Sequence, residues 1–166
     1  MKKLGWIGIV LVFVFSLAAC GSKNPQDMVS EALGVDASTG STMSSMDTHS
    51  GNGDGTSCVV LHFDGNEMIK QIKADNAWKS FPLDKTVQTL VYGVSDETSS
   101  VGPFLTDEDG KVLVPEIANG YYRLIDRQVE QGKATGTDIL NRASFNFTVG
   151  IYDTDTNTLY CCELDT

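Results

Sequence analysis

The strongest constraint on the fold is an alternating pattern close to the C-terminal end of the sequence. Over 145–152, Phe, Phe, Val and Ile alternate with Asn, Thr, Gly and Tyr, which predicts a β-strand with one buried face. The segment 153–157 reads Asp-Thr-Asp-Thr-Asn and predicts a turn into a last strand over 158–164. Strands joined by so short a turn pair antiparallel, so we expect an antiparallel sheet.

Helical patterns occur in the first two thirds of the chain. Asn24 is typical of a helix N-cap and Pro25 of the first helical position, and Gly34 is placed to end the same helix. Apolar residues at helical spacing predict two further helices, one around 68–72 and one over 83–91.

Strand patterns separate and follow these helices. Segment 57–63 is apolar on both faces and predicts an interior strand, and 120–126 predicts another strand. Short strands at 104–105 and 112–114 flank an expected turn, and 127–137 is polar and predicts a loop. This order predicts an α+β fold: a single domain with an antiparallel sheet and two or three helices packed on it.

The segment 36–56 has two interpretations. It is rich in Gly, Ser, Thr and Asp, which is the composition of a flexible linker. Alternatively, 41–46 forms an edge strand, a long loop follows, and 57–63 pairs with it as a hairpin. We favour the hairpin.

The first nineteen residues have the pattern of an export signal. Lys2 and Lys3 give a positive start, and 4–15 contains no polar residue. The apolar run over 4–19 is shorter than the roughly 20 residues that a membrane-spanning helix needs. It has the length of the apolar region of a signal peptide.

The end of this run carries a specific motif. Leu17-Ala18-Ala19-Cys20 resembles the lipobox of bacterial lipoproteins. The resemblance implies cleavage after Ala19 and a lipid on Cys20, so that 1–19 is a lipoprotein signal peptide. Residues 20–24 would then be a lipidated tether and 25–166 the extracytoplasmic domain. The implied location is the extracytoplasmic face of the cell membrane, with the plasma membrane of a Gram-positive host favoured.

The charge of the chain limits its partners. The formal net charge is −10, and without Lys2 and Lys3 ten basic residues face 22 acidic ones, which gives −12. A chain with this balance has no basic patch for nucleic-acid phosphates. It would also be repelled by an anionic membrane surface, so its membrane attachment would depend on the lipid on Cys20.

One loop contains residue types that bind metal ions. Within the sequence DTHSGNGDG, the potential ligands of a divalent metal ion are Asp47, His49, Asn52 and Asp54. The alternative is a solvated hairpin loop that uses Gly, Asn and Asp for their turn geometry, and we favour it. The spacing matches no established metal motif.

The turn at 153–157 also has a metal-like spacing. Its Asp-x-Asp-x-Asn pattern matches the opening of an EF-hand calcium loop, but Thr158 stands where the motif needs Gly and Leu164 where it needs Glu. We therefore interpret the segment as a hairpin turn.

The cysteines allow one intramolecular disulfide. With Cys20 lipidated, three cysteines remain, so at least one of them is free or pairs with another chain. Cys161 and Cys162 are adjacent in a predicted strand and point to opposite faces, so only one of them can reach Cys58. Either pairing is open, and the alternative is that all three are small packing residues.

A set of aromatic and basic residues has the composition of a protein interface. The set comprises Trp78, Tyr121, Tyr122, Arg123 and Arg127. An envelope protein partner would bind there. The alternative, which we favour, is that they are core aromatics and local ion pairs.

The sequence contains no recognisable catalytic constellation. Cys58 and His62 share a strand face but lie four residues apart, roughly 13 Å, which is too far for proton transfer. The part of the chain after the leader resembles small exported lipoproteins without an assigned function. We therefore expect a non-catalytic binding or interaction module at the cell envelope. The alternative is a metal-dependent or hydrolytic enzyme that uses the loop 47–54.

Overall fold

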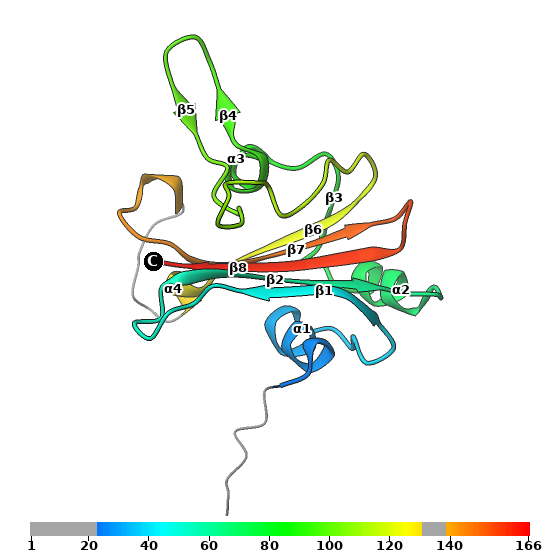
Figure 1. The fold of residues 1–166 in the computed structure, drawn as a ribbon. Coiled ribbons are helices and arrows are strands. Elements are labelled where there is room, and N and C mark those ends of the chain that lie inside the picture. Colours follow the sequence, from blue (N-terminus) through cyan, green and yellow to red (C-terminus); the bar gives the residue numbers. More distant parts are fainter. Residues whose placement is uncertain (1–22, 131–138) are drawn as a thin grey trace, which may run out of the picture.

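The computed structural model describes residues 23–130 and 139–166 (Figure 1). The predicted signal peptide, the lipobox with Cys20 and most of the predicted tether lie outside these residues. The described part contains an antiparallel sheet of six strands and four α-helices, so the expectation of an α+β fold is confirmed at that level. No helix in 23–130 or 139–166 combines the length and the apolar character needed to cross a bilayer.

The elements follow one another in an order that brings sequence-distant strands together. They are α1 (Pro25–Leu33), β1 (Ser41–Asp47), β2 (Gly55–His62), α2 (Glu67–Ala74), β3 (Lys79–Ser80), α3 (Lys85–Tyr92), β4 (Val94–Ser95), β5 (Ser100–Val101), β6 (Gly120–Asp126), α4 (Arg127–Glu130), a 3-10 turn (Ile139–Asn141), β7 (Asn146–Asp153) and β8 (Thr158–Asp165).

The sheet has the strand order β1-β2-β8-β7-β6-β3, with every neighbouring pair antiparallel. The predicted C-terminal hairpin is β7–β8, and it occupies the centre of the sheet. The strands β1 and β2 pair directly with each other. Of the two interpretations of 36–56, the hairpin is therefore confirmed and the flexible linker is not. The predicted interior strand is β2, which lies between β1 and β8.

The helix boundaries follow from their capping residues. Asn24 Oδ1 accepts a hydrogen bond of 2.8 Å from the backbone N–H of Asp27, and Pro25 is the first helical residue. Gly34 ends α1 with a left-handed φ of 64°, a conformation that glycine adopts without steric cost. The predicted start and end of this helix are therefore confirmed.

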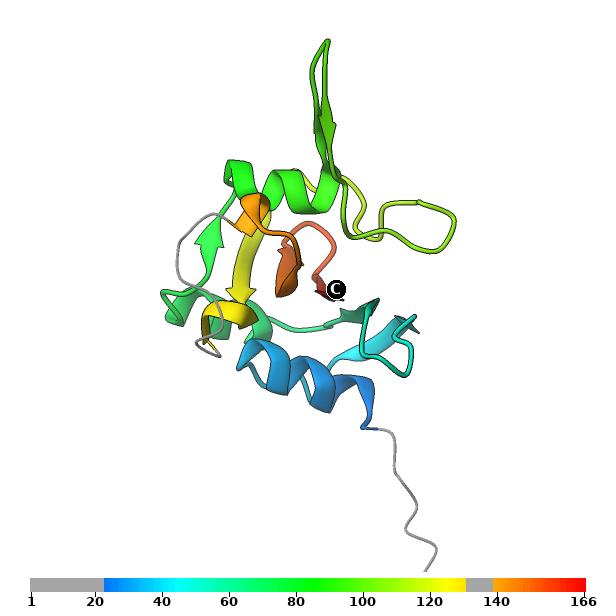
Figure 2. The ribbon, with the colours of Figure 1, turned by 90° about the vertical axis from the view of Figure 1, so that its left-hand side faces the viewer.

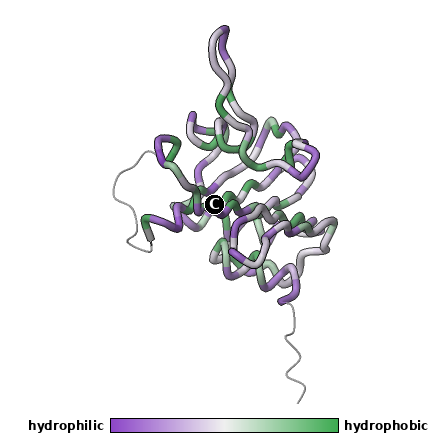
Figure 3. The backbone as a smooth tube through the Cα atoms, turned by 60° about the vertical axis from the view of Figure 1, so that its left-hand side comes forward, coloured by the Kyte–Doolittle hydropathy of each residue, from purple (hydrophilic) through white to green (hydrophobic). Residues whose placement is uncertain are grey.

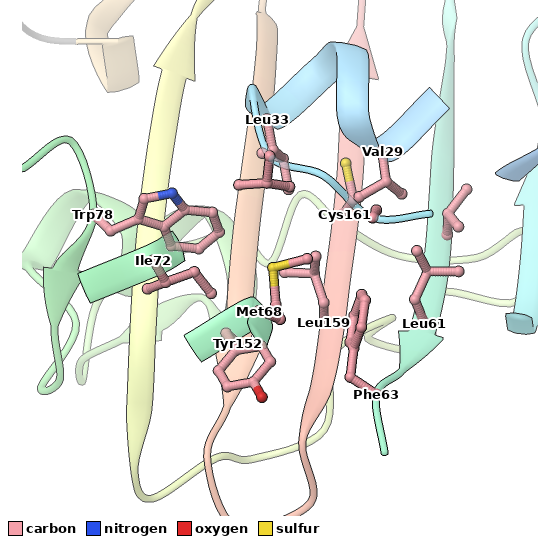
Figure 4. Close-up of a cluster of buried hydrophobic side chains, with 13 residues drawn as sticks. Val29, Leu33, Leu61, Phe63, Met68, Ile72, Trp78, Tyr152, Leu159 and Cys161 are labelled. Carbon is pink, nitrogen blue, oxygen red and sulfur yellow. The ribbon is translucent and has the colours of Figure 1, made fainter. Parts of the chain in front are cut away.

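One face of the sheet is covered by α1 and α2. Figure 4 shows Leu33 and Val29 of α1, and Met68 and Ile72 of α2, packed with Trp78 over β7 and β8. Gly150 of β7 makes room for this layer. A Cβ at that position would lie 2.8 Å from the Trp78 ring and 2.9 Å from Leu33.

The other face is covered by α3 and by the segments that surround it. Val87, Leu90 and Val91 of α3 are fully buried there, together with Leu105 and Phe147. Figures 1 and 2 show α1 and α3 on opposite sides of the sheet. The central strands are consequently buried on both faces, which explains why β2 and β8 lack a polar face.

A small two-stranded ribbon projects from the α3 side of the molecule (Figure 1). It is formed by β4 and β5, in which Val94 pairs with Val101 and both side chains are exposed. Figure 3 shows hydrophilic residues at its tip. The sequence patterns did not predict this ribbon, because each of its strands is only two residues long.

Two local expectations were wrong. The polar segment that begins at Arg127 opens with the short helix α4 and not with a loop, because Asp126 Oδ1 accepts the backbone N–H of Val129. The expected strand pair around 104–114 is reduced to a single bridge between Thr106 and Val112. The turn predicted at 107–110 is present, since the N–H of Gly110 donates to the carbonyl of Asp107.

Candidate functional site

The metal-type residues of the β1–β2 loop form an ion-pair cluster. His49 Nδ1 lies 2.6 Å from Asp47 Oδ1, and His49 Nε2 lies 3.1 Å from Asp165 Oδ2 at the end of β8. Burial alone would lower the pKa of His49, but the hydrogen bonds and charges of Asp47 and Asp165 outweigh it and raise the pKa above the usual 6.5. An imidazole held between two carboxylates has no free lone pair for a metal ion.

The other two loop residues face one another. Asn52 Nδ2 donates to Asp54 Oδ2 at 2.8 Å, and the Ser50 hydroxyl also bonds to Asn52. The four predicted ligands are thus divided between two clusters. Across residues 23–130 and 139–166, no group of three or more His, Cys, Asp or Glu side chains is arranged to hold a metal ion. The described geometry thus does not assemble Asp47, His49, Asn52 and Asp54 into one ligand set, and the metal site stays a prediction.

Arg127 extends the ion-pair cluster of His49. Its Nη2 lies 2.7 Å from Asp165 Oδ2, and its Nη1 lies 3.3 Å from Glu163. The same guanidinium also donates to the backbone carbonyl of Phe147 at 3.3 Å. Arg127 therefore joins α4 to β7 and β8, and its charge is already neutralised. It was predicted as an interface residue, and its contacts are structural.

Three further members of the predicted interface set are also structural. Trp78 is buried in the α1–α2 layer, and the Tyr122 hydroxyl bonds to Asp84 at 3.2 Å. Arg123 Nη1 donates to Asp75 at 3.0 Å and to the carbonyl of Leu33 at 2.9 Å. The favoured alternative, core aromatics and local ion pairs, describes these residues.

Within 23–130 and 139–166, the three cysteines offer no accessible nucleophile. Cys58 and Cys162 are partners in the β2–β8 register and form a disulfide. Cys161 points to the opposite face and is buried, and burial raises the pKa of its thiol. The two ring nitrogens of His49 face carboxylates, so they are not placed to activate a hydroxyl or a thiol. This arrangement provides no nucleophile–base pair of the kind that hydrolysis needs.

A wide hollow of the described surface lies beside α3, and we call it the α3 cleft. It is lined by Lys73 of α2, the connection 80–83, one side of α3, the segment 117–121 and Thr154 in the β7–β8 turn. Its volume is about 630 Å³. That size lies within the roughly 300–1,000 Å³ of ordinary small-molecule sites.

The walls of the α3 cleft are about equally polar and apolar. Phe81, Tyr92 and Tyr121 supply aromatic surface, and the side-chain amides of Gln88 and Asn119 also line the cleft. Tyr121 is the only member of the predicted interface set that lies here. Ligand sites combine apolar contact area with a few polar groups that orient the ligand, and the α3 cleft contains both kinds of group.

The only cationic side chain that lines this cleft is Lys73. Its ammonium lies 6.0 Å from the centre of the Tyr121 ring. Within 23–130 and 139–166, no carboxylate lies within 4.0 Å of this ammonium, whereas Lys70 and Lys79 are both paired with acidic residues. Lys73 therefore has its charge free for a ligand.

Tyr92 is a neutral wall of the cleft at all ordinary pH values. Burial raises the pKa of its phenol to about 12, and the nearby charge of Glu116 acts in the same direction. Its hydroxyl donates to the carbonyl of Pro115 at 2.7 Å, which fixes the ring against the 115–117 segment. The phenol thus contributes shape to the cleft and no charge.

A smaller hollow of about 230 Å³ adjoins the α3 cleft. It is lined by Gln88, Tyr92, Glu116 and Ile117, and all of these except Glu116 also line the larger cleft. The two hollows therefore lie next to each other and share part of their lining, with Lys73 in the larger and Glu116 in the smaller.

Sequence reasoning did not find the α3 cleft, since its lining comes from five separate segments. None of these segments contains a motif, and their proximity depends on the non-local order of the strands. Only one sequence feature could have indicated the cleft. It is Phe81-Pro82, which lies shortly before α3 and places an aromatic ring near the start of that helix. Comparisons of the chain with protein-family models, curated proteins and solved structures found no match.

Proposed function

We propose that this protein is a lipid-anchored, extracytoplasmic binding module that takes a small ligand in the α3 cleft. One observation carries the proposal: an open cleft of about 630 Å³ has aromatic walls, side-chain amides and an ammonium group without a carboxylate partner. Those features together provide both apolar contact area and polar groups that orient a ligand.

The chemistry of the cleft favours binding over catalysis. Its lining includes neither histidine nor cysteine. The Thr154 hydroxyl donates to the carbonyl of Asn119, and the Tyr92 phenol is neutral, so neither is set up as a nucleophile or a base. The cleft has groups that hold a ligand and lacks a pair of groups that would transform it.

The anchor is supported by the sequence and by the position of the first helix. The lipobox-like motif ends at Cys20, and α1 begins at Pro25. A tether of five residues spans at most about 18 Å. A lipid on Cys20 would therefore hold the domain close to the membrane surface, although its net charge of −12 does not favour an anionic bilayer.

Ligand-induced stabilisation tests the proposal. The full chain, purified in detergent, is screened by thermal unfolding against a library of small metabolites and peptides, because a bound ligand raises Tm. Replacing Ala118, an exposed residue of the cleft wall, by Trp fills the cleft; Ala143→Trp adds the same ring at an exposed position outside it.

The two variants make the screen decisive. We expect ligands that stabilise the wild type and A143W but leave A118W unchanged. A library in which no compound stabilises the wild type, or in which A118W retains every shift, would overturn the proposed site.

A further inference from the structure

The two adjoining hollows beside α3 carry opposite charges. Lys73 lines the larger hollow and Glu116 the smaller, and the residues shared by both are Gln88, Tyr92 and Ile117. A ligand that fills both hollows would meet an ammonium group, then an aromatic and aliphatic wall with a side-chain amide, and then a carboxylate.

Both charges are available to a ligand. In the described part of the chain, the carboxylate of Glu116 has no hydrogen-bond or ion-pair partner, and Lys73 has only the ring of Tyr121. The neighbouring acidic groups differ in this respect. Asp155 accepts the side-chain amide of Asn119 at 3.0 Å, and Asp153 accepts the Thr156 hydroxyl at 2.7 Å.

The net charge of the molecule restricts the class of ligand further. A chain with a net charge of −10 repels a purely anionic ligand at long range, and a purely cationic ligand would meet Lys73 in the larger hollow. A ligand that is neutral overall, with one positive and one negative end, satisfies both groups. Charge complementarity of this kind selects the ligand and fixes its orientation.

We infer that the ligand is a short peptide with free termini, its carboxylate at Lys73 and its ammonium at Glu116. The inference rests on the proposed function, because it names the ligand of the same cleft. The rings of Phe81 and Tyr92 would receive apolar side chains of the peptide, and the side-chain amide of Gln88, which lines both hollows, would bond to its backbone.

Calorimetric titration with three matched peptide pools tests this inference. The probes are a mixed pool of tripeptides with free termini, the same pool with acetylated N-termini and the same pool with amidated C-termini. With the full chain in detergent, we expect the free pool to bind and each modification to weaken binding roughly 10-fold to 150-fold, the range of one charged hydrogen bond.

Variants that remove one charge from the cleft show which protein residue contacts each terminus of the peptide. Lys73→Gln is expected to bind the free and the amidated pools equally, and Glu116→Gln to bind the free and the acetylated pools equally. The matched controls are Lys70→Gln, one turn earlier on α2 and outside the cleft, and Glu108→Gln, in the exposed 107–110 turn. Both controls should retain the full discrimination.

The outcomes separate the inference from the proposed function. Equal binding of the three pools, or discrimination that survives K73Q and E116Q, overturns the peptide inference. Failure of the free pool at millimolar concentration overturns it as well. In each case the proposed function stands if other library compounds still stabilise the wild type and not A118W, and it fails with the inference if none does.

Discussion

At the scale of single residues, His49 makes the stability of the fold depend on pH. Its ring is held by Asp47 and Asp165, which raise its pKa above 6.5. The protonated ring therefore stabilises the fold below about pH 6.5, and this contribution is lost as the pH rises through the raised pKa. At the acid end, hydrogen bonds from His49 hold the pKa of Asp47 below 3.8, so its contribution is lost as the pH falls through that lowered value.

We therefore predict that His49→Gln lowers the free energy of unfolding by roughly 0.5–1 kcal/mol near pH 5 and by less near pH 8. Urea unfolding of both proteins at the two pH values measures the difference. His62→Gln serves as the matched histidine control. A loss that is equal at both pH values would contradict the assignment of charge to His49.

Gly150 tests the packing of the α1–α2 layer. A methyl group at this position would press on Trp78 and Leu33, so Gly150→Ala is expected to cost roughly 1–3 kcal/mol of stability. Gly51→Ala is the control, because a Cβ there meets no atom within 4 Å. Urea unfolding that gives the same midpoint for both variants would show that Trp78 does not pack over this glycine.

Residue patterns predicted caps and turns well and side-chain roles poorly. The cap at Asn24 and the glycine that ends α1 depend only on neighbouring residues, so local sequence was sufficient. Trp78 and Tyr121 were predicted as members of the same interface set. In the structure Trp78 is buried under α1, whereas Tyr121 lines the α3 cleft. Their difference depends on which elements cover each face, and no local pattern encodes that.

At the scale of elements, the alternation over 145–152 correctly indicated a hairpin with its last strand. It did not indicate that β8 is inserted between β2 and β7, because that pairing joins residues about 100 positions apart. The order matters for chemistry, since it brings Cys58 opposite Cys162 and leaves Cys161 on the other face.

The disulfide between β2 and β8 should contribute strongly to stability. It closes a loop with a sequence separation of 104, and loops of that length correspond to roughly 2–5 kcal/mol. We predict that a reductant lowers the urea midpoint of the wild type but not that of the double variant C58A/C162A. Equal midpoints of the wild type with and without reductant would contradict this contribution.

Mass spectrometry identifies the pairing independently of stability. After alkylation in denaturant without reduction, which exposes the buried Cys161, we expect the Cys58 peptide joined to the C-terminal peptide, with the alkyl group on Cys161. A cross-link from Cys58 to Cys161, or alkyl groups on all three cysteines, would contradict the described register.

At the scale of the whole molecule, the proposed attachment depends on one residue. We predict that Cys20→Ser abolishes incorporation of labelled palmitate and moves the protein out of the membrane fraction. Cys161→Ser is the matched control and should remain labelled and membrane-bound. Palmitate incorporation that persists in the Cys20 variant would contradict the lipid anchor.

The α3 cleft also belongs to this scale, and this is why the sequence did not reveal it. Each lining segment is unremarkable by itself: the end of α2, a proline turn, one side of α3 and two loops. The cleft exists because β6 and β7 bring 117–121 and Thr154 beside α3. The sequence led us to expect an acidic binding module, and the cleft proposed for its ligand exists only in the assembled fold.

The central claim is that a ligand binds in this cleft, and the most direct measurement is its position on the molecule. Backbone amide spectra of the isotope-labelled full chain are recorded in detergent during titration with the free-terminus peptide pool. The account predicts saturable shifts concentrated at Lys73, Gln88, Tyr92 and the segment 116–121, and none of them in A118W. Shifts that centre on the β1–β2 loop or the β4–β5 ribbon, or that persist in A118W, would contradict it.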